Sequence, residues 1–162
     1  MIILMMGVSG CGKTTIGQLL AQSINYEFYD ADSFHPTANI AKMRLGIPLN
    51  DEDRMPWLAS LQAQIKIWFQ ENKNVVLGCS ALKNSYRQML IINNTIQLVY
   101  LHGNFDVIEK RLQRRENHFM TEKLLRSQFD ILEEPDNALW IDICQPLGVI
   151  VDQIRESLVE KM

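Results

Sequence analysis

The residues most able to do chemistry stand near the start of the chain, where residues 7–15 read GVSGCGKTT. This stretch satisfies the spacing G-x-x-x-x-G-K-[ST], with an apolar run before it and a helical pattern after it. Glycines in such a loop let backbone N–H groups point inward around phosphates, and the helix N-terminus adds its dipole. The pattern predicts a nucleoside triphosphate site, in which Lys13 neutralises β- and γ-phosphate charge and Thr14 binds Mg²⁺. The predicted nucleotide-binding residues of the loop are Gly7, Val8, Ser9, Gly10, Cys11, Gly12, Lys13, Thr14 and Thr15.

The loop by itself does not say which phosphate chemistry the protein performs. A GTPase would carry a D-x-x-G switch after a later strand and an N-K-x-D base-reading motif, and the chain contains neither. A chain of 162 residues is also short for a motor ATPase. A kinase of small molecules is the class that remains. The alternative from another class is a nucleotide-binding module without catalysis.

Two carboxylates follow the second apolar run, in the stretch YDADSFHP. On an extended segment Asp30 and Asp32 point to the same side, because side chains alternate along a strand. One carboxylate could then hold Mg²⁺ through water while the other accepts a hydrogen bond from an attacking hydroxyl group. The plainer interpretation is a solvated acidic turn before Pro36. His35 is equally open to a structural and to a substrate-facing role.

Basic residues occur in two later segments, although the chain is acidic overall. Arg54 directly follows three acidic residues, so it either forms a surface ion pair or offers its guanidinium group to an acidic substrate. Lys83 and Arg87 stand four residues apart on an expected helix, where they would share one face. They either belong to a solvated helix face or supply positive charge for an anionic acceptor.

Three further arginines, Arg111, Arg114 and Arg115, stand near the end of an expected helix and in the loop after it. Such a cluster is either a solvated basic helix end or part of a mobile lid, expected at about residues 111–121. A lid of this kind excludes water and stabilises the charge that develops during phosphoryl transfer.

The elements that position these residues follow from short apolar runs that alternate with helical patterns. The alternation is typical of an α/β protein with a mainly parallel sheet, and the chain length favours a single domain, residues 1–162. Open parallel sheets bind ligands at the carboxyl ends of their strands, where the residues above stand. Pro56 is expected to open the helix that carries Trp57 and Leu61 on its apolar face. The expected strands are Ile2–Met6, Glu27–Asp30, Asn74–Cys79, Gln97–Leu101 and Leu139–Ile143.

Composition indicates the cellular setting and the kind of partner. A formal net charge of −3 and a pI of about 5.6 give no overall attraction to nucleic acid or to an anionic membrane. Three widely spaced cysteines argue against a disulfide scaffold and favour a reducing compartment. The opening run MIILMM lacks a basic flank and is too short for a secretory signal or a membrane span. We therefore expect a cytoplasmic protein that binds neither nucleic acid nor membrane.

Together these motifs resemble the gluconokinase family of small P-loop kinases. The resemblance rests on GVSGCGKTT, DADSFHPTANIAKMRLGIPLNDEDRMPWL, CSALKNSYRQML, YLHGNFDVIEKRLQRRENHF, QFDILEEP and IDICQPL, which span nearly the whole chain. It implies ATP-dependent phosphorylation of D-gluconate at its 6-hydroxyl group. It also implies a five-stranded parallel sheet with helices on both faces, and often a homodimer. Shikimate and nucleoside monophosphates are the rival acceptors, but CSALK stands where a shikimate kinase would carry a glycine-rich turn.

The resemblance also assigns roles by position. Lys13, Asp32 and Arg115 would be catalytic, with Asp32 at the attacking hydroxyl group. Thr14 and Asp30 would hold Mg²⁺, the latter through water. The expected substrate-binding residues are Asp32, His35, Arg54, Lys83 and Arg87. Outside the loop, the expected ATP-binding residues are Arg111, Gln145 and Pro146.

Two positions depart from the pattern of the family. Cys11 stands where a small Ser or Ala is expected, which leaves phosphate binding intact and could add sensitivity to oxidation. Ala31 stands between the two aspartates where close relatives carry glycine. That change keeps both carboxylates.

Overall fold

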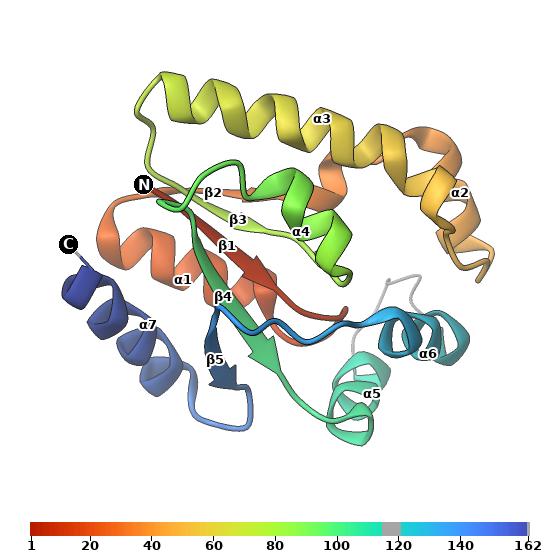
Figure 1. Ribbon diagram of the computed structural model, residues 1–162. Coiled ribbons are helices and arrows are strands. Elements are labelled where there is room, and N and C mark those ends of the chain that lie inside the picture. The colour runs from red at the N-terminus through yellow and green to blue at the C-terminus, as the bar shows by residue number, and fades with distance from the viewer. Residues whose placement is uncertain (115–120, 162) are drawn as a thin grey trace.

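The fold is built on five parallel strands in the order β2-β3-β1-β4-β5 (Figure 1). The computed structural model describes residues 1–114 and 121–161. The strands are β1 (Ile2–Met6), β2 (Glu27–Asp30), β3 (Val75–Gly78), β4 (Gln97–His102) and β5 (Leu139–Asp142). The five strands expected from the sequence are thus confirmed, each boundary within one residue. Their apolar runs form strands because both faces of the central strands are covered.

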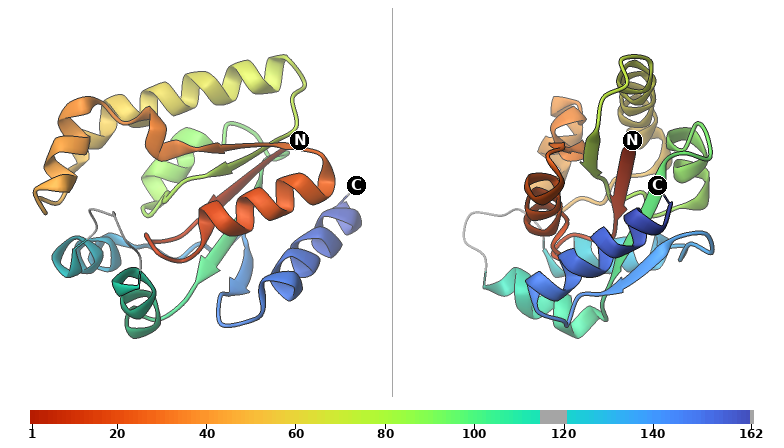
Figure 2. Two further views of the ribbon diagram at one scale, coloured as in Figure 1. Left: turned by 180° about the vertical axis from the view of Figure 1, so that it is seen from behind. Right: turned by 90° about the vertical axis from the view of Figure 1, so that its left-hand side faces the viewer.

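Helices cover both faces of the sheet, as expected (Figure 2). On one face lie α1 (Lys13–Ile24) and α7 (Leu147–Lys161), and on the other lie α3 (Asp51–Gln70) and α4 (Asn84–Leu90). Strand β1 divides its side chains between two apolar clusters, Ile3 and Met5 facing one way and Ile2, Leu4 and Met6 the other. Across the described residues, no helix is both long and apolar enough to cross a membrane.

The remaining helices stand beyond the carboxyl ends of the strands, and both chain termini lie at the opposite end of the sheet (Figure 1). These helices are the 3₁₀ helix η1 (Ala31–Phe34), α2 (Thr37–Arg44), α5 (Phe105–Gln113) and α6 (Glu122–Ile131). Because β1 is the central strand, the loop that follows it opens into the middle of this assembly. The fold therefore brings the phosphate-loop motif next to the segments after β2, β3 and β4.

Helix α3 begins earlier than the sequence indicated. The Asn50 side chain accepts a hydrogen bond from the N–H of Asp53 at 2.8 Å, and the Asp53 carboxylate accepts one from the N–H of Asn50 at 3.0 Å. This capping box satisfies N–H groups of the first turn and starts the helix at Asp51. Pro56 consequently lies inside the helix and does not open it.

Candidate active site

The loop between β1 and α1 has the backbone shape that phosphate binding requires. Gly10 and Gly12 adopt φ values of 84° and 101°, a left-handed conformation that residues with a Cβ rarely adopt. A Cβ on Gly10 would also lie 2.8 Å from Cγ of Leu112. The Lys13 ammonium group reaches back over the loop and donates to the carbonyls of Gly7 at 2.7 Å and Val8 at 3.1 Å. These two hydrogen bonds hold the Lys13 ammonium group next to the backbone at the start of the loop.

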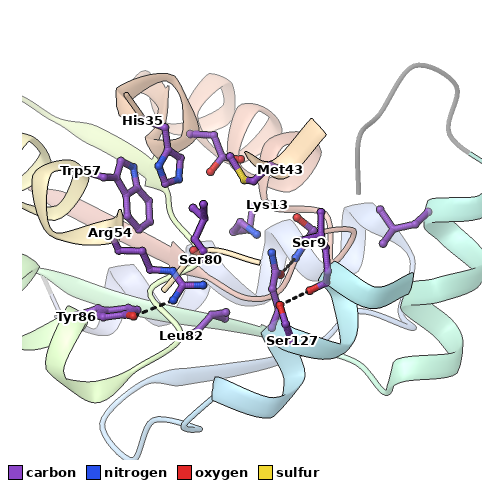
Figure 3. A pocket seen from close by; sticks show the side chains of 15 residues that line it. Ser9, Lys13, His35, Met43, Arg54, Trp57, Ser80, Leu82, Tyr86 and Ser127 are labelled. Carbon is purple, nitrogen blue, oxygen red and sulfur yellow. Dashed lines mark hydrogen bonds between the residues drawn. The ribbon is translucent and has the colours of Figure 1, made fainter. Parts of the chain in front are cut away.

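A cavity of about 140 Å³, which we call the central cavity, opens beside this loop. Five residues that the sequence predicted to act in binding or catalysis line it, namely Ser9, Lys13, Asp32, His35 and Arg54. Its other polar lining residues are Ser80, Tyr86, Ser127 and Gln128. Figure 3 shows Trp57, Arg54 and Tyr86 on one side of the cavity and Ser9 and Ser127 on the other. Tertiary structure thus joins residues from four separate segments.

The two aspartates after β2 do not share one extended segment, contrary to the expectation. Asp30 ends β2, and its carboxylate accepts a hydrogen bond from the N–H of Asp32 at 2.9 Å, so the chain turns into η1. Of the two, only Asp32 lines the central cavity. Asp32 is exposed and lines the cavity. Desolvation by the surrounding protein raises the pKa of its carboxyl group, the charge on Asp30 raises it further, and Lys13 opposes both.

His35 enters the cavity as a neutral ring with a defined tautomer. The amide nitrogen of Asn39 donates to the carbonyl of Asp53 at 2.8 Å and lies 3.1 Å from Nδ1 of His35. An amide N–H₂ group only donates, so Nδ1 accepts and the ring proton resides on Nε2. The ring also stacks on Trp57, with centroids 4.2 Å apart. Burial, aided by the charge of Arg54, lowers the pKa of His35 to about 4.

Asn39 is a site residue that the sequence reasoning missed. The residue is only 4% exposed, and its side chain connects the α2 segment to the first turn of α3. Buried polar groups are kept where they have partners, and here the partner is a predicted substrate-binding ring. The only signal in the sequence was its place within the N-I-A-K-M stretch that follows His35.

Arg54 faces the cavity through a chain of polar contacts. Its guanidinium group donates to the hydroxyl group of Tyr86 at 3.1 Å, and that hydroxyl group donates to the carboxylate of Asp51. Lys83 contacts the same carboxylate at 2.9 Å. Among the described residues Arg54 forms no ion pair, so its charge is available to the cavity. Two of the three acidic residues before it pair elsewhere, Asp51 with Lys83 and Asp53 with Lys42, each at 2.9 Å.

Lys83 and Arg87 do not share a helix face. Lys83 precedes α4 as its N-cap residue. Arg87 is 4% exposed, and its guanidinium group donates to the backbone carbonyls of Ala81 at 2.8 Å, Leu82 at 3.2 Å and Glu133 at 2.8 Å. Neither side chain lines the central cavity. The predicted contact of Arg87 with substrate stays a prediction, and three of the five guanidinium N–H donors already bind backbone carbonyls.

The predicted nucleotide-binding residues outside the loop gather near the carboxyl end of β5. Arg111 in α5 donates to the carbonyl of Ile143 at 2.7 Å. Gln145 donates to the carbonyl of Asp142 at 3.0 Å, and Pro146 directly precedes α7. None of these three residues lines the central cavity. Arg115 and residues 115–120 of the expected lid lie outside the described residues.

The donors available near the loop fit a magnesium ion. Thr14 is exposed in the first turn of α1, and Asp30 ends β2, which β3 separates from β1 in the sheet. In the part of the chain that the structure describes, no three His, Cys, Asp or Glu side chains form a metal-binding group. Mg²⁺ does not require such a group, since it takes one or two protein oxygen ligands and completes its shell with phosphates and water.

A glycine loop after a central parallel strand, a lysine over that loop and a carboxylate in an adjoining cavity define a P-loop kinase of small molecules. Comparison with known proteins narrows this class. The shikimate kinase family profile matches residues 9–142. A thermoresistant gluconokinase of Escherichia coli is 43% identical over 95% of this chain and 91% of its own. A probable gluconokinase of Xenopus tropicalis is 40% identical over 100% and 95% of the two chains.

Solved structures give the same result. A gluconokinase from Sinorhizobium meliloti is 37% identical, covers 98% of this chain and 95% of its own, and superposes with a TM-score of 0.83. The chain therefore belongs to the gluconokinase family, within the wider group that the shikimate kinase profile describes. The resemblance and the fold class expected from the sequence are both confirmed.

Proposed function

We propose that this protein transfers the γ-phosphoryl group of ATP to the 6-hydroxyl group of D-gluconate. One observation carries the proposal: the central cavity holds Lys13 of the phosphate loop, the Asp32 carboxylate and the Arg54 guanidinium group together. A phosphate-binding cation, a hydroxyl-orienting carboxylate and a cation for an acidic substrate are the three groups that this reaction needs. Gluconokinase relatives that align over nearly the full chain support the choice of acceptor.

In this proposal the protein positions the reactants and neutralises charge. The 6-hydroxyl oxygen forms a bond to the γ-phosphorus atom as the bond to the β–γ bridging oxygen breaks, and ADP leaves with that oxygen. Asp32 orients the hydroxyl group and receives its proton, and a carboxyl pKa raised by desolvation favours that acceptance. Lys13 offsets the charge on the phosphates. Mg²⁺ held near Thr14 and Asp30 would supply further neutralisation of phosphate charge.

The remaining cavity residues would bind the sugar acid. Arg54 would pair with the gluconate carboxylate, in the bidentate geometry that guanidinium groups favour. His35 would donate its Nε2–H to a gluconate hydroxyl group, because Asn39 occupies Nδ1. Lys83 would act on Arg54 through Asp51 and Tyr86, without touching substrate. The proposal assigns no substrate contact to Arg87.

The finer parts of the function stand on the family resemblance. They are ATP as the phosphoryl donor with Mg²⁺, Arg111, Gln145 and Pro146 at the nucleotide, and Arg115 at the transferring phosphoryl group. They also include a homodimer and a cytoplasmic location, without nucleic acid or membrane as partner. Light scattering of the purified protein tests the dimer, and magnesium titration of activity tests the metal.

The deciding experiment measures ADP release by the purified protein with Mg²⁺-ATP and D-gluconate, shikimate, AMP or no acceptor. We expect turnover with gluconate alone, and its loss in Lys13→Ala, which removes the phosphate-neutralising cation. Turnover with shikimate or AMP instead would keep the kinase class and overturn the substrate. A folded protein that binds ATP and is inactive with every acceptor would favour the non-catalytic module.

A further inference from the structure

Gln128 of α6 connects a helix far along the chain to the phosphate loop. Its side-chain oxygen, Oε1, accepts a hydrogen bond from the backbone N–H of Ser9 at 2.8 Å, across 119 residues of sequence. Gln128 also lines the central cavity, together with Lys13 and Asp32. The amide therefore contacts the phosphate loop and lines the same cavity as the Asp32 carboxylate. Sequence reasoning included it only as the first letter of QFDILEEP.

The position of Oε1 has a chemical meaning. Backbone N–H groups of a phosphate loop point toward anions, so an acceptor 2.8 Å from the Ser9 nitrogen occupies a place suited to a phosphate oxygen. The amide oxygen carries a partial negative charge and fills that place as a neutral substitute. Ser9 is the third residue of the eight-residue motif, ahead of Gly12 and Lys13, on the side of the loop that faces the cavity.

The amide group of a glutamine can also act as a hydrogen-bond donor if it rotates about its terminal side-chain torsion. The terminal torsion of glutamine is broad and roughly two-fold, so the oxygen and the N–H₂ group exchange places at little cost. Ser127, the neighbouring hydroxyl group in the cavity, donates to the carbonyl of Leu124 at 2.9 Å. Helix α6 is itself held by the Thr121 cap and by Leu124 and Leu125, which are buried. The Gln128 amide is thus presented from a well-anchored helix.

We propose that Gln128 is a catalytic residue that donates its amide N–H₂ to an oxygen of the transferring γ-phosphoryl group. In this role the phosphoryl oxygen takes the Ser9 N–H, and the Gln128 amide turns so that its nitrogen faces the same phosphoryl group. The neutral amide would donate a hydrogen bond to the γ-phosphoryl oxygens, whose negative charge redistributes during transfer. This bond would add to the electrostatic stabilisation that Lys13 supplies. The inference rests on the proposed kinase function and assigns a residue to the γ-phosphate that the loop motif does not contain.

The test separates the acceptor role of the amide from its donor role. Gln128→Glu keeps an oxygen acceptor for Ser9 but loses the N–H₂ donor and adds a negative charge. We expect a kcat at least about 10²-fold lower, at least tenfold weaker ATP binding, and ADP binding within twofold of the wild type. Gln128→Leu should lose the preference for ATP over ADP to a smaller extent. Asp130→Asn, an exposed change on the same helix, is the matched control and should leave all three values unchanged.

Calorimetric titrations of ATP and ADP into each variant, without acceptor, provide the readout. Turnover and a preference for ATP at wild-type levels in both Gln128 variants would overturn the proposal. The hydrogen bond to Ser9 would then only hold α6 against the phosphate loop. Equal weakening of ATP and ADP would also overturn the proposal, because it would mean that the loop itself had been distorted. The ATP-to-ADP comparison needs no acceptor, so a wrong assignment of gluconate would leave this test intact. Retained ADP binding shows in the same titration that each variant is folded.

Discussion

At the scale of single residues, the central cavity is defined by which atoms are free to act and which are already engaged. Asp32 offers a carboxylate whose pKa desolvation raises. His35 offers only Nε2–H, since Asn39 holds Nδ1. Arg54 forms no ion pair among the described residues, and Asp51 and Asp53 before it pair with Lys83 and Lys42.

Replacing Asp32 by Asn should lower kcat by about 10²-fold, because the attacking hydroxyl group loses the acceptor that orients it. ATP affinity should change little, since the loop supplies the phosphate contacts. Steady-state kinetics with gluconate and calorimetric titration of ATP measure the two effects. Asp152→Asn, on the exposed face of α7, is the control. A loss confined to ATP binding would move Asp32 to the metal site.

Replacing Tyr86 by Phe should raise the KM for gluconate about three- to tenfold and leave kcat within twofold. The change removes the hydroxyl group that contacts both Arg54 and Asp51, and one hydrogen bond contributes about 0.5–1.5 kcal/mol. Kinetics over a range of gluconate concentrations check this. Tyr29→Phe, which removes a hydrogen bond to Glu27 on the exposed edge strand, should change neither constant. A drop in kcat alone would contradict a role in substrate binding.

At the scale of elements, buried polar contacts decide how the helices sit on the sheet. The capping box at Asn50 sets where α3 begins and which of its side chains reach the cavity. Arg87 fastens α4 to the segment after α6 through the carbonyls of Ala81, Leu82 and Glu133. Spacing alone left this arginine open to either a solvated helix face or an anionic acceptor, and the family resemblance assigned it to the substrate.

Arg87→Ala should destabilise the fold by about 3 kcal/mol, because it leaves buried carbonyl groups without donors. The KM for gluconate of the folded variant should stay within twofold of the wild type. Urea unfolding and kinetics below the transition measure both effects. Arg155→Ala, on an exposed position of α7, should cost less than about 0.5 kcal/mol. A large rise in KM with unchanged stability would restore the substrate-binding role of Arg87.

At the scale of the whole molecule, the strand order brings the parts of the site together. The central strand β1 delivers the phosphate loop, with the segment after β2 on one flank and the segment after β5 on the other. Helix α6 returns from late in the chain to contact Ser9. The cavity forms only when four segments of the chain fold together. A cavity residue whose pKa differs between the native and the unfolded chain therefore makes the free energy of unfolding depend on pH.

Acid should destabilise the protein through His35. Its native pKa of about 4 lies below the unfolded value of 6.5, so between these values the unfolded chain binds a proton that the native chain does not. The unfolding free energy therefore falls as pH drops from 6.5 toward 4, by about 1 kcal/mol between pH 7 and pH 5 once solvent screening is allowed for. Urea unfolding of wild type and His35→Gln at both pH values measures this. Equal pH dependence in the two proteins would contradict the lowered pKa.

The sequence by itself determined the features that depend on neighbouring residues. The phosphate loop is recognisable because eight consecutive positions control both its backbone shape and its charge. The five strands are recognisable because buried parallel strands require unbroken apolar runs. The same local patterns were enough to indicate a kinase and its family.

Only the tertiary structure decided which polar side chains face the cavity. Arg54 and Arg87 are both basic residues within helices, yet Arg54 faces the cavity and Arg87 donates to backbone carbonyls. Asn39 and Gln128 are positioned at the site by hydrogen bonds to Asp53 and Ser9, which lie 14 and 119 residues away in the sequence. Spacing along a helix says which residues share a face, but packing and the need to satisfy buried hydrogen-bonding groups determine where that face points.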